Sequence, residues 1–347
     1  MKSTLFYIIP VLCVLLLSTF SCQKDNLPFT ENHLDFSVDT VLFDTIFTTV
    51  GSTTKRFKVY NRNNSPIQID AIELMNVSEN YRLNIDGLAQ NSVFDTELAA
   101  GDSMFIFVEV TLDPNNMSNP LIIEDSIRFE TNGKSQYINL AAWGQDAYFH
   151  VNEIVQGNWA NDKPHVIYGL AAVGYPGIDS NLNLTIPANT QVHLHKNSSL
   201  IVYKSSLTVN GMKDQEVVFQ GDRLEAYYDD KSGQWNGIRF IQATPSNIDY
   251  AIVKNGSVGL QIDTTGIVSP STPTLTVSNT IVQNNAFYGI LVNSGAFVQA
   301  TNCLFGNSGF YSGLFYAGGK YEFTNCTFGN NFPASRSTPL FKLVNYF

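Results

Sequence analysis

The second half of the chain contains an internal repeat, and this repeat limits the possible folds more than any other feature of the sequence. Four related segments, YAIVKNG, NTIVQNN, NCLFGNS and NCTFGNN, begin at residues 250, 279, 302 and 325, so successive copies are 29, 23 and 23 residues apart. The longer interval contains Thr264–Pro273, rich in Ser, Thr, Pro and Gly, which we expect to be a loop extruded from one repeat. A period in the low twenties, with short apolar strands and Asn-rich bends, predicts the coils of a parallel β-helix.

Alignment of the four segments predicts columns of equivalent side chains that fill the interior of this helix. One column contains small residues: Ala251, Thr280, Cys303 and Cys326. Two residues later, and therefore on the same face of each strand, stands a column of larger apolar residues: Val253, Val282, Phe305 and Phe328. Alternating small and large columns allow a narrow interior to pack densely.

Asparagine recurs at the bends of the repeat in two further columns. The members are Asn279, Asn302 and Asn325 in one column, and Asn255, Asn284, Asn307 and Asn330 in the other. We expect these residues to adopt left-handed backbone geometry and to bond from coil to coil as a structural ladder. Cys303 and Cys326 lie one coil apart, within disulfide range, but stacked parallel side chains point the same way, which favours two buried free thiols.

The segment before the repeats resembles a known protein family. LNLTIPANT and LTVNGMKDQEVVFQG, followed by GQWNGIRFI, resemble the entry coils of the right-handed β-helix proteins of Bacteroidota, with Asn189 in place of the usual Gly. The resemblance runs from about residue 163 to the end and implies a pectate-lyase-like fold, without an established activity. We therefore expect a right-handed parallel β-helix over residues 151–347.

Residues 34–148 have a different pattern, in which short alternating strands are separated by turn clusters such as Asn61–Pro66 and Asn132-Gly133. About seven strands at such spacing predict a β-sandwich. The progression from FKVYNRNNSPIQIDAIEL to ELAAGDSMFIFVEV and INLAAWG resembles the immunoglobulin-like domains of the ASPM/SPD-2/Hydin type. That resemblance implies a spacer or a binding module. The expected fold class is thus all-β, an immunoglobulin-like sandwich followed by the β-helix.

The N-terminus predicts export. A charged start and an apolar stretch over residues 5–17 lead into small residues and then Cys22, so residues 1–21 are typical of a signal peptide. The cysteine resembles the lipobox of bacterial lipoproteins, which implies lipidation of Cys22, an anchor linker over 22–33 and attachment to the outer membrane. Asp25 resembles the surface-export signal of Bacteroidota lipoproteins and implies the outer leaflet. The alternative is a cleaved secretory signal with an incidental cysteine.

The net negative charge of the chain limits the classes of binding partner that we expect. Removal of residues 1–21 leaves 19 basic and 30 acidic residues, which argues against nucleic acid. It also disfavours a highly anionic glycan unless calcium bridges the two. No dinucleotide, P-loop or zinc motif is present, so no cofactor is expected.

The acid-poor repeats argue against catalysis. Residues 275–331 contain one acid, Glu322, and one base, Lys320, so they lack the carboxylate pair of a glycoside hydrolase. Charges gather instead before Trp235, in a segment that we interpret either as a glycan-contacting loop or as an ordinary solvated loop. Its candidate ligand-binding residues are Asp222, Arg223, Glu225, Tyr227, Tyr228, Asp229, Asp230 and Lys231. Calcium at Asp229 and Asp230 is conceivable, although no metal-site spacing supports it.

Two further groups of residues are candidates for ligand contact. His193 and His195 alternate on one strand and could both be metal ligands, but no third ligand is nearby, which favours a surface or edge pair. An aromatic patch is expected at the coil bends, either covering the flank or stacking on sugars: Tyr288, Phe310, Tyr311, Phe315 and Tyr316. Tyr311 is the member we place among the ligand-binding residues. Trp235 is expected to pack beneath the charged loop.

These observations predict a non-catalytic cell-envelope lipoprotein, anchored through Cys22, that binds a glycan or an envelope protein through β-helix loops. The alternative is a carbohydrate-active enzyme, a polysaccharide lyase or glycoside hydrolase, that uses acids of the Asp222–Lys231 segment. A third hypothesis is a structural envelope component whose last coil docks another subunit.

Overall fold

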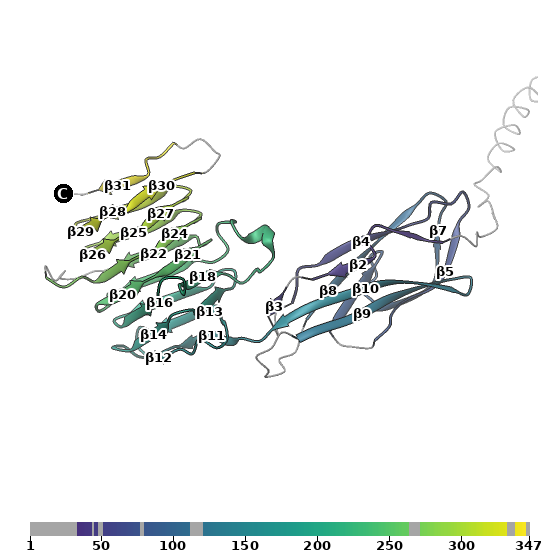
Figure 1. The fold of residues 1–347 in the computed structure, drawn as a ribbon, viewed down its shortest axis with the longest axis horizontal. Coiled ribbons are helices and arrows are strands. Elements are labelled where there is room, and N and C mark those ends of the chain that lie inside the picture. Colours follow the sequence, from purple (N-terminus) through teal and green to yellow (C-terminus); the bar gives the residue numbers. More distant parts are fainter. Residues whose placement is uncertain are drawn as a thin grey trace, which may run out of the picture. The chain divides into compact units, whose positions relative to one another are not determined.

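The computed structural model describes residues 33–43, 45–47, 51–76, 80–111, 121–263, 271–331 and 337–344. These residues form an all-β structure (Figure 1), as predicted, with one single-turn 3-10 helix, η1 (Ala226–Tyr228). The predicted signal peptide and Cys22 lie outside the described residues. The chain divides into two compact units, one from residues 1–41, 53–109 and 124–141 and the other from 42–52, 110–123 and 142–347.

Two sheets occupy residues 35–145. The first has the strand order β1 (Asp35–Phe36), β4 (Lys55–Tyr60), β8 (Ser103–Val110), β6 (Tyr81–Ile85). The second has the order β2 (Thr40–Leu42), β10 (Lys134–Gln145), β9 (Leu121–Thr131), β5 (Ile67–Leu74), β7 (Ser92–Leu98), and β3 (Ile46–Phe47) also pairs with β10. β4 is antiparallel to both of its neighbours, and β5 is antiparallel to β7 and β9.

The alternation read from the sequence buries one face of each of these sheets. β8 has the buried positions Met104, Ile106, Val108 and Val110. The two buried faces pack against each other, because Phe129 of β9 lies 4.9 Å from Phe36 of β1 and 6.3 Å from Phe57 of β4, measured between ring centroids. The predicted turn at Asn132-Gly133 joins β9 to β10 with both residues at positive φ, the geometry that a two-residue hairpin requires.

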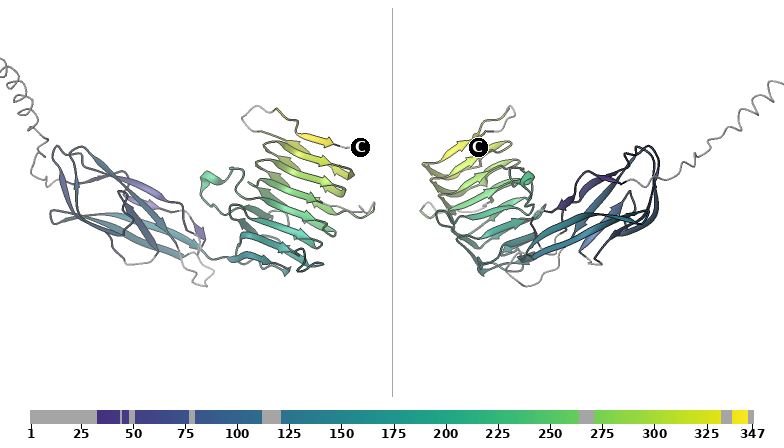
Figure 2. Two further views of the ribbon diagram at one scale, coloured as in Figure 1. Left: turned by 180° about the vertical axis from the view of Figure 1, so that it is seen from behind. Right: turned by 45° about the vertical axis from the view of Figure 1, so that its right-hand side comes forward.

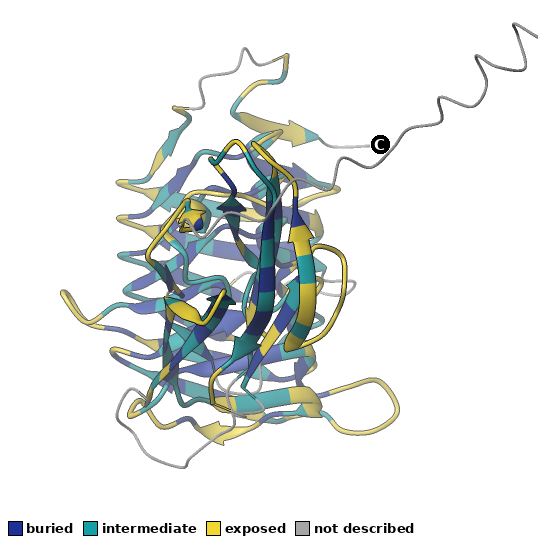
Figure 3. Cartoon of the chain, turned by 90° about the vertical axis from the view of Figure 1, so that its right-hand side faces the viewer, coloured by how far each residue is buried: buried dark blue, intermediate teal, exposed yellow. Residues whose placement is uncertain are grey.

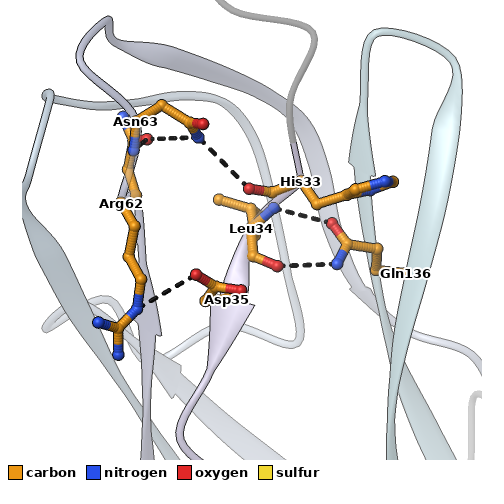
Figure 4. Close-up of polar contacts among 7 residues, drawn as sticks. His33, Leu34, Asp35, Arg62, Asn63 and Gln136 are labelled. Carbon is orange, nitrogen blue, oxygen red and sulfur yellow. Dashed lines mark hydrogen bonds and ion pairs between the residues drawn. The ribbon is translucent and has the colours of Figure 1, made fainter.

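Side-chain bonds hold the start of the described chain (Figure 4). Gln136 accepts a hydrogen bond from the Leu34 amide at 3.0 Å and donates one to the Leu34 carbonyl at 2.8 Å, so it imitates a strand partner. Arg62 forms an ion pair with Asp35 at 3.1 Å, and the Asn63 amide donates to the His33 carbonyl. The Leu34 side chain is buried as a result.

Residues 148–344 form a β-helix with three faces (Figure 2). The first face contains β15 (Gln191–Leu194), β18 (Val217–Gly221), β21 (Ala251–Lys254), β24 (Ile281–Gln283), β27 (Leu304–Gly306) and β30 (Thr327–Gly329). The second contains β16 (Ser199–Tyr203), β19 (Gly237–Ile241), β22 (Val258–Asp263), β25 (Tyr288–Ser294), β28 (Tyr311–Tyr316) and β31 (Phe341–Val344). The third contains β12 (Gly157–Asn158), β14 (Asn183–Pro187), β17 (Ser206–Asn210), β20 (Ser246–Asp249), β23 (Leu275–Ser278), β26 (Ala296–Thr301) and β29 (Gly319–Thr324).

The first two faces meet in one long strand at the beginning of the helix. The first half of β13 (His165–Val173) pairs with β15 and its second half pairs with β16. β11 (Tyr148–Ile154) lies on the other side of β13, also in parallel. From there each coil adds one strand to each face, in parallel register with the coil before it.

The predicted interior columns are confirmed. Val253 pairs with Val282, Val282 with Phe305, and Phe305 with Phe328. The Phe305 and Phe328 rings stack with centroids 5.0 Å apart. The small column is also internal, with Ala251, Thr280 and Cys303 buried and Cys326 partly buried. Figure 3 shows buried positions recurring along the strands of the stacked coils. Both cysteines are free thiols.

One predicted loop lies mostly outside the described residues. The excursion Thr264–Pro273 falls between β22 and β23, and only residues 271–273 of it are described.

Candidate functional site

The charged segment identified in the sequence forms a long loop at the corner between the first and second faces. We call residues 222–236 the corner loop; it joins β18 to β19 and contains η1 (Figure 1). Four other coils cross this corner with the short connections 195–198, 255–257, 284–287 and 307–310, and the last coil crosses it with residues 330–340, of which 332–336 lie outside the described residues. Trp235 at the end of the loop is buried, as expected, and its indole N–H donates to the Lys254 carbonyl at 2.9 Å.

Gln234, near the end of the corner loop, fixes the middle of the loop. Its amide donates to the carbonyls of Tyr228 and Lys231, both at 2.7 Å. The Gln234 side chain packs against Gly221, where an added Cβ would lie 2.1 Å from Gln234 Oε1. Glycine at the end of β18 therefore allows the loop to sit close to the coil.

The asparagine ladder binds the loop from the neighbouring coils. Asn255 Nδ2 donates to the carbonyls of Tyr228 at 3.2 Å and Asp229 at 2.9 Å. Asn284 Nδ2 donates to the Asp230 carboxylate at 3.1 Å, and its own Oδ1 accepts from Asn307 at 3.2 Å. The loop is thus fixed by side chains of the two coils that follow it.

The ladder residues have the backbone geometry that asparagine tolerates best. Positive φ values between 46° and 67° occur at Asn255, Asn279, Asn284, Asn302, Asn307 and Asn325. In the column that contains Asn279, Asn302 and Asn325, Asn302 Nδ2 donates to Asn279 Oδ1 at 2.7 Å. Asn330 differs from the others, because its φ is not positive. Its Oδ1, like that of Asn255, is buried with no hydrogen-bond partner within the described residues.

A pocket of about 470 Å³ lies between the corner loop and the preceding coil. Its lining residues are His195, Lys196, Asp222, Arg223, Tyr228, Lys231, Ser232, Gly233 and Gln234. The lining combines one aromatic ring with charged and amide side chains. It is a concave site in which polar groups and apolar surface lie side by side, an arrangement that can orient a small ligand.

His195 and Asp222 form a close pair in this pocket. His195 Nδ1 lies 2.6 Å from Asp222 Oδ2, and the Asp222 side chain is only 6 % exposed. The Tyr168 ring stacks on His195 with centroids 4.3 Å apart. Burial and the negative charge of Asp222 raise the pKa of Tyr168 to about 12, so its hydroxyl keeps its proton.

The structure brings half of the predicted loop residues into the pocket. Asp222, Arg223, Tyr228 and Lys231 line it. The others, Glu225, Tyr227, Asp229 and Asp230, do not. Tyr227 is 70 % exposed, and its ring carries the Lys231 ammonium group 4.6 Å above it.

Tyr311 belongs to a separate aromatic group. It stacks on Tyr288 of the preceding coil, and the exposed Phe310 ring stacks in the same way on Phe287, which the sequence analysis did not identify. The prediction that Phe315 joins this patch was wrong, because Phe315 is fully buried in the helix interior. It pairs with Val292 and continues an interior column.

The prediction of a surface pair of histidines was also wrong for His193. This side chain is buried, and its Nδ1 donates to the Gly221 carbonyl at 3.1 Å. Burial lowers the pKa of His193 to about 4, which keeps the ring neutral. Only His195 reaches the pocket, so the two do not form a common ligand set.

Sequence analysis missed Lys196, Tyr168 and Gln234, and it did not connect His195 with Asp222. A signal was present. Leu194 pairs with Gly221, so the next residues in the same register are His195 and Asp222. Aligning QVHLHK with VVFQGDR would have placed them one above the other.

Two structural features are absent from the described residues. No group of three or more His, Cys, Asp or Glu side chains in this part of the chain could hold a metal ion. Among the same residues, no helix has the length and apolar character needed to cross a membrane.

Comparison with known proteins supports the second half of the fold. Residues 178–328 match the family model of the right-handed β-helix region. The described strands of these residues are the parallel coils of the β-helix, so this part of the predicted fold is confirmed. No curated protein matches the chain.

Solved structures offer only distant similarities. VesB protease of Vibrio cholerae is 13 % identical over 33 % of this chain and 32 % of its own, with a TM-score of 0.24. A family 123 glycoside hydrolase from Clostridium perfringens is 10 % identical over 33 % of this chain and 26 % of its own, with the same TM-score. The ASH/PapD-like domain (domain 7) of human CEP192 is 9 % identical over 37 % of this chain and 96 % of its own, with a TM-score of 0.22. The chain thus spans about a third or less of the first two.

Proposed function

We propose that this chain is an exported, lipid-anchored protein that binds carbohydrate in the pocket beneath the corner loop. The observation that carries the proposal is the pocket itself, a polar concavity of about 470 Å³ built onto the side of a β-helix. A β-helix fits a carbohydrate-binding or carbohydrate-active role because its stacked coils present a long, regular flank. The corner loop is the long connection of this corner that the structure describes in full.

The lining suits a sugar. Tyr228 offers an aromatic ring, while Ser232 and Lys196 offer hydrogen-bond donors for hydroxyl groups. The loop is held by Gln234 and by two ladder asparagines, so little ordering is needed when a ligand binds.

A polysaccharide panel tests this proposal. The purified full-length chain in detergent is assayed for binding and for released reducing or unsaturated ends, with and without EDTA to detect a role for calcium. Tyr228→Ala should weaken binding, whereas Tyr311→Ala, which removes a stacked tyrosine outside the pocket, should not. The opposite result would assign binding to the aromatic group, and no binding to any polysaccharide would refute the proposal.

The anchor is part of the same proposal. We infer that Cys22 is lipidated, that the protein is attached to the outer membrane of a Bacteroidota cell and displayed on its surface, and that the two sheets of the first half are an immunoglobulin-like spacer. In cells, Cys22→Ala should move the protein from the membrane fraction to the soluble fraction. Protease added to intact cells should degrade the wild-type protein, and protection would place it in the periplasm.

An enzyme is the second candidate, and the His195–Asp222 pair is the observation in its favour. Asp222 occupies Nδ1 of His195, which leaves Nε2, unbonded within the described residues, as the nitrogen that could accept a proton. Asp229 and Asp230 do not line the pocket, so His195 is a better candidate base than either. If the panel yields product, His195→Gln should abolish its release and retain binding, whereas Asp229→Asn should leave both unchanged.

A further inference from the structure

The basic residues of the corner loop lie in the lining of the pocket, whereas most of its acidic residues do not. Its two basic residues, Arg223 and Lys231, both line the pocket, and Lys196 from the preceding coil joins them. No carboxylate within the described residues forms an ion pair with any of these three cations. The Lys231 ammonium group lies above the Tyr227 ring, 4.6 Å from the ring centroid.

The acids of the loop do not neutralise these cations. Asp222 is the one carboxylate in the lining, and it is nearly buried and paired with His195. The Asp230 carboxylate accepts from Asn284 outside the pocket. Three cations therefore face one occupied carboxylate in a chain whose formal charge is −10.

The net negative charge of the whole chain does not by itself determine the electrostatic potential in this pocket. Charges more than about 8 Å apart are largely screened at physiological ionic strength. Within the lining itself the formal balance is positive, with three cations and one carboxylate. The expectation that the chain disfavours an anionic glycan is therefore not a reliable guide to the ligand of this pocket.

We propose that the pocket recognises an anionic group, a carboxylate or a sulfate, carried on a polysaccharide. This inference rests on the proposed function and names the class of ligand. Arg223 supplies a planar fork that can bind a carboxylate or sulfate through two parallel hydrogen bonds. Lys196 and Lys231 add two point charges, and the neighbouring Tyr228 ring contacts the sugar that carries the anion.

Affinity electrophoresis of the full-length chain in detergent tests this inference with three probes. Polygalacturonate carries carboxylates, dextran sulfate carries sulfates, and dextran is neutral. We expect retardation by one or both anionic polymers and none by dextran, with the retardation falling several-fold between about 50 mM and about 500 mM NaCl. The polymer that retards the protein identifies which anion is bound.

A matched pair of variants separates the pocket from the general charge of the protein. The double variant Arg223→Gln, Lys231→Gln should bind about tenfold or more weakly, because charge-assisted hydrogen bonds are lost. The control Lys213→Gln, Lys320→Gln removes the same two charges outside the pocket lining and should bind like wild type. Unchanged circular dichroism and melting would show that both variants fold.

The outcomes distinguish the two proposals. Equal, salt-insensitive binding of dextran would overturn the anionic ligand and leave carbohydrate binding in place. Equal loss in both double variants would overturn the role of the pocket. Binding of none of the three polymers would overturn the anionic ligand, and carbohydrate binding would fall with it if the wider panel were also silent.

Discussion

Replacement of Asn255 should loosen the corner loop more than it destabilises the β-helix. This residue has φ = 67° and donates two hydrogen bonds to loop carbonyls, those of Tyr228 and Asp229. Each such bond contributes about 1 kcal/mol net. Asn255 Oδ1 is buried without a partner within the described residues, so its removal offsets part of the loss. We expect Asn255→Gly to favour the open loop by about 1–2 kcal/mol.

Two further variants separate the loop contacts from backbone strain. Asn255→Ala loses the same bonds but keeps a Cβ in left-handed geometry, which makes it less stable than the glycine variant by about 1 kcal/mol. Asn302→Gly is the control, because Asn302 also has a positive φ and its side chain donates to the ladder residue Asn279. Urea denaturation should thus rank Asn255→Ala below Asn255→Gly.

Limited trypsin digestion measures the loop directly, since Arg223 and Lys231 are cleavage sites within it. Cleavage of an opened segment follows its population, so a shift of 1–2 kcal/mol should raise the rate about 5- to 30-fold. Mass spectrometry identifies chains cut after either residue. If both Asn255 variants were cut no faster than Asn302→Gly, the ladder would not be what holds the loop, and the reasoning would be refuted.

Three other predictions follow from buried groups. Burial lowers the pKa of His165 and His193 to about 4, below the unfolded value near 6.5, so the unfolded chain takes up protons first. The free energy of unfolding should therefore fall as pH drops from about 6.5 to about 4, by up to about 3 kcal/mol per histidine, and His193→Gln should remove its share of that slope in urea titrations. Burial raises the pKa of Cys303 to about 12, so iodoacetamide at pH 8 should label Cys303 only after unfolding. If Cys303 of the native protein were labelled as fast as Cys326, this prediction would be wrong. Phe305→Ala should destabilise the β-helix by about 3–5 kcal/mol, measured by urea denaturation, and a loss below about 1 kcal/mol would mean that the stacked column repacks.

The repeat made most of the β-helix predictable. Because parallel coils place equivalent residues one above another, alignment of four short segments was enough to assign the columns that contain Val253 and Ala251. The same procedure, applied to the second face, would have placed Phe315 above Val292 in the interior. That error came from judging a residue by its aromatic neighbours instead of by its register.

The environment of a side chain was harder to predict than its direction. Alternation gives His193 an outward direction, but it does not reveal what covers the outer surface. Within the second unit the Phe47 ring lies 4.7 Å from His193, and no local pattern connects two residues so far apart in sequence. The corner loop posed the same difficulty, because an insertion has no second copy against which its inward and outward residues can be aligned.

The way the loop is attached explains why an insertion is tolerated at this corner. Extending the register of β18 and β21 places Gly221 where later coils have Asn255, Asn284 and Asn307, so this coil lacks its ladder asparagine. The carbonyls of Tyr228 and Asp229 accept the bonds of Asn255 in its place. The corner loop therefore completes the ladder on one side while it carries Arg223 and Lys231 to the pocket on the other. A change of either side chain can therefore alter the charge of the pocket without loss of the backbone contacts that hold the coil.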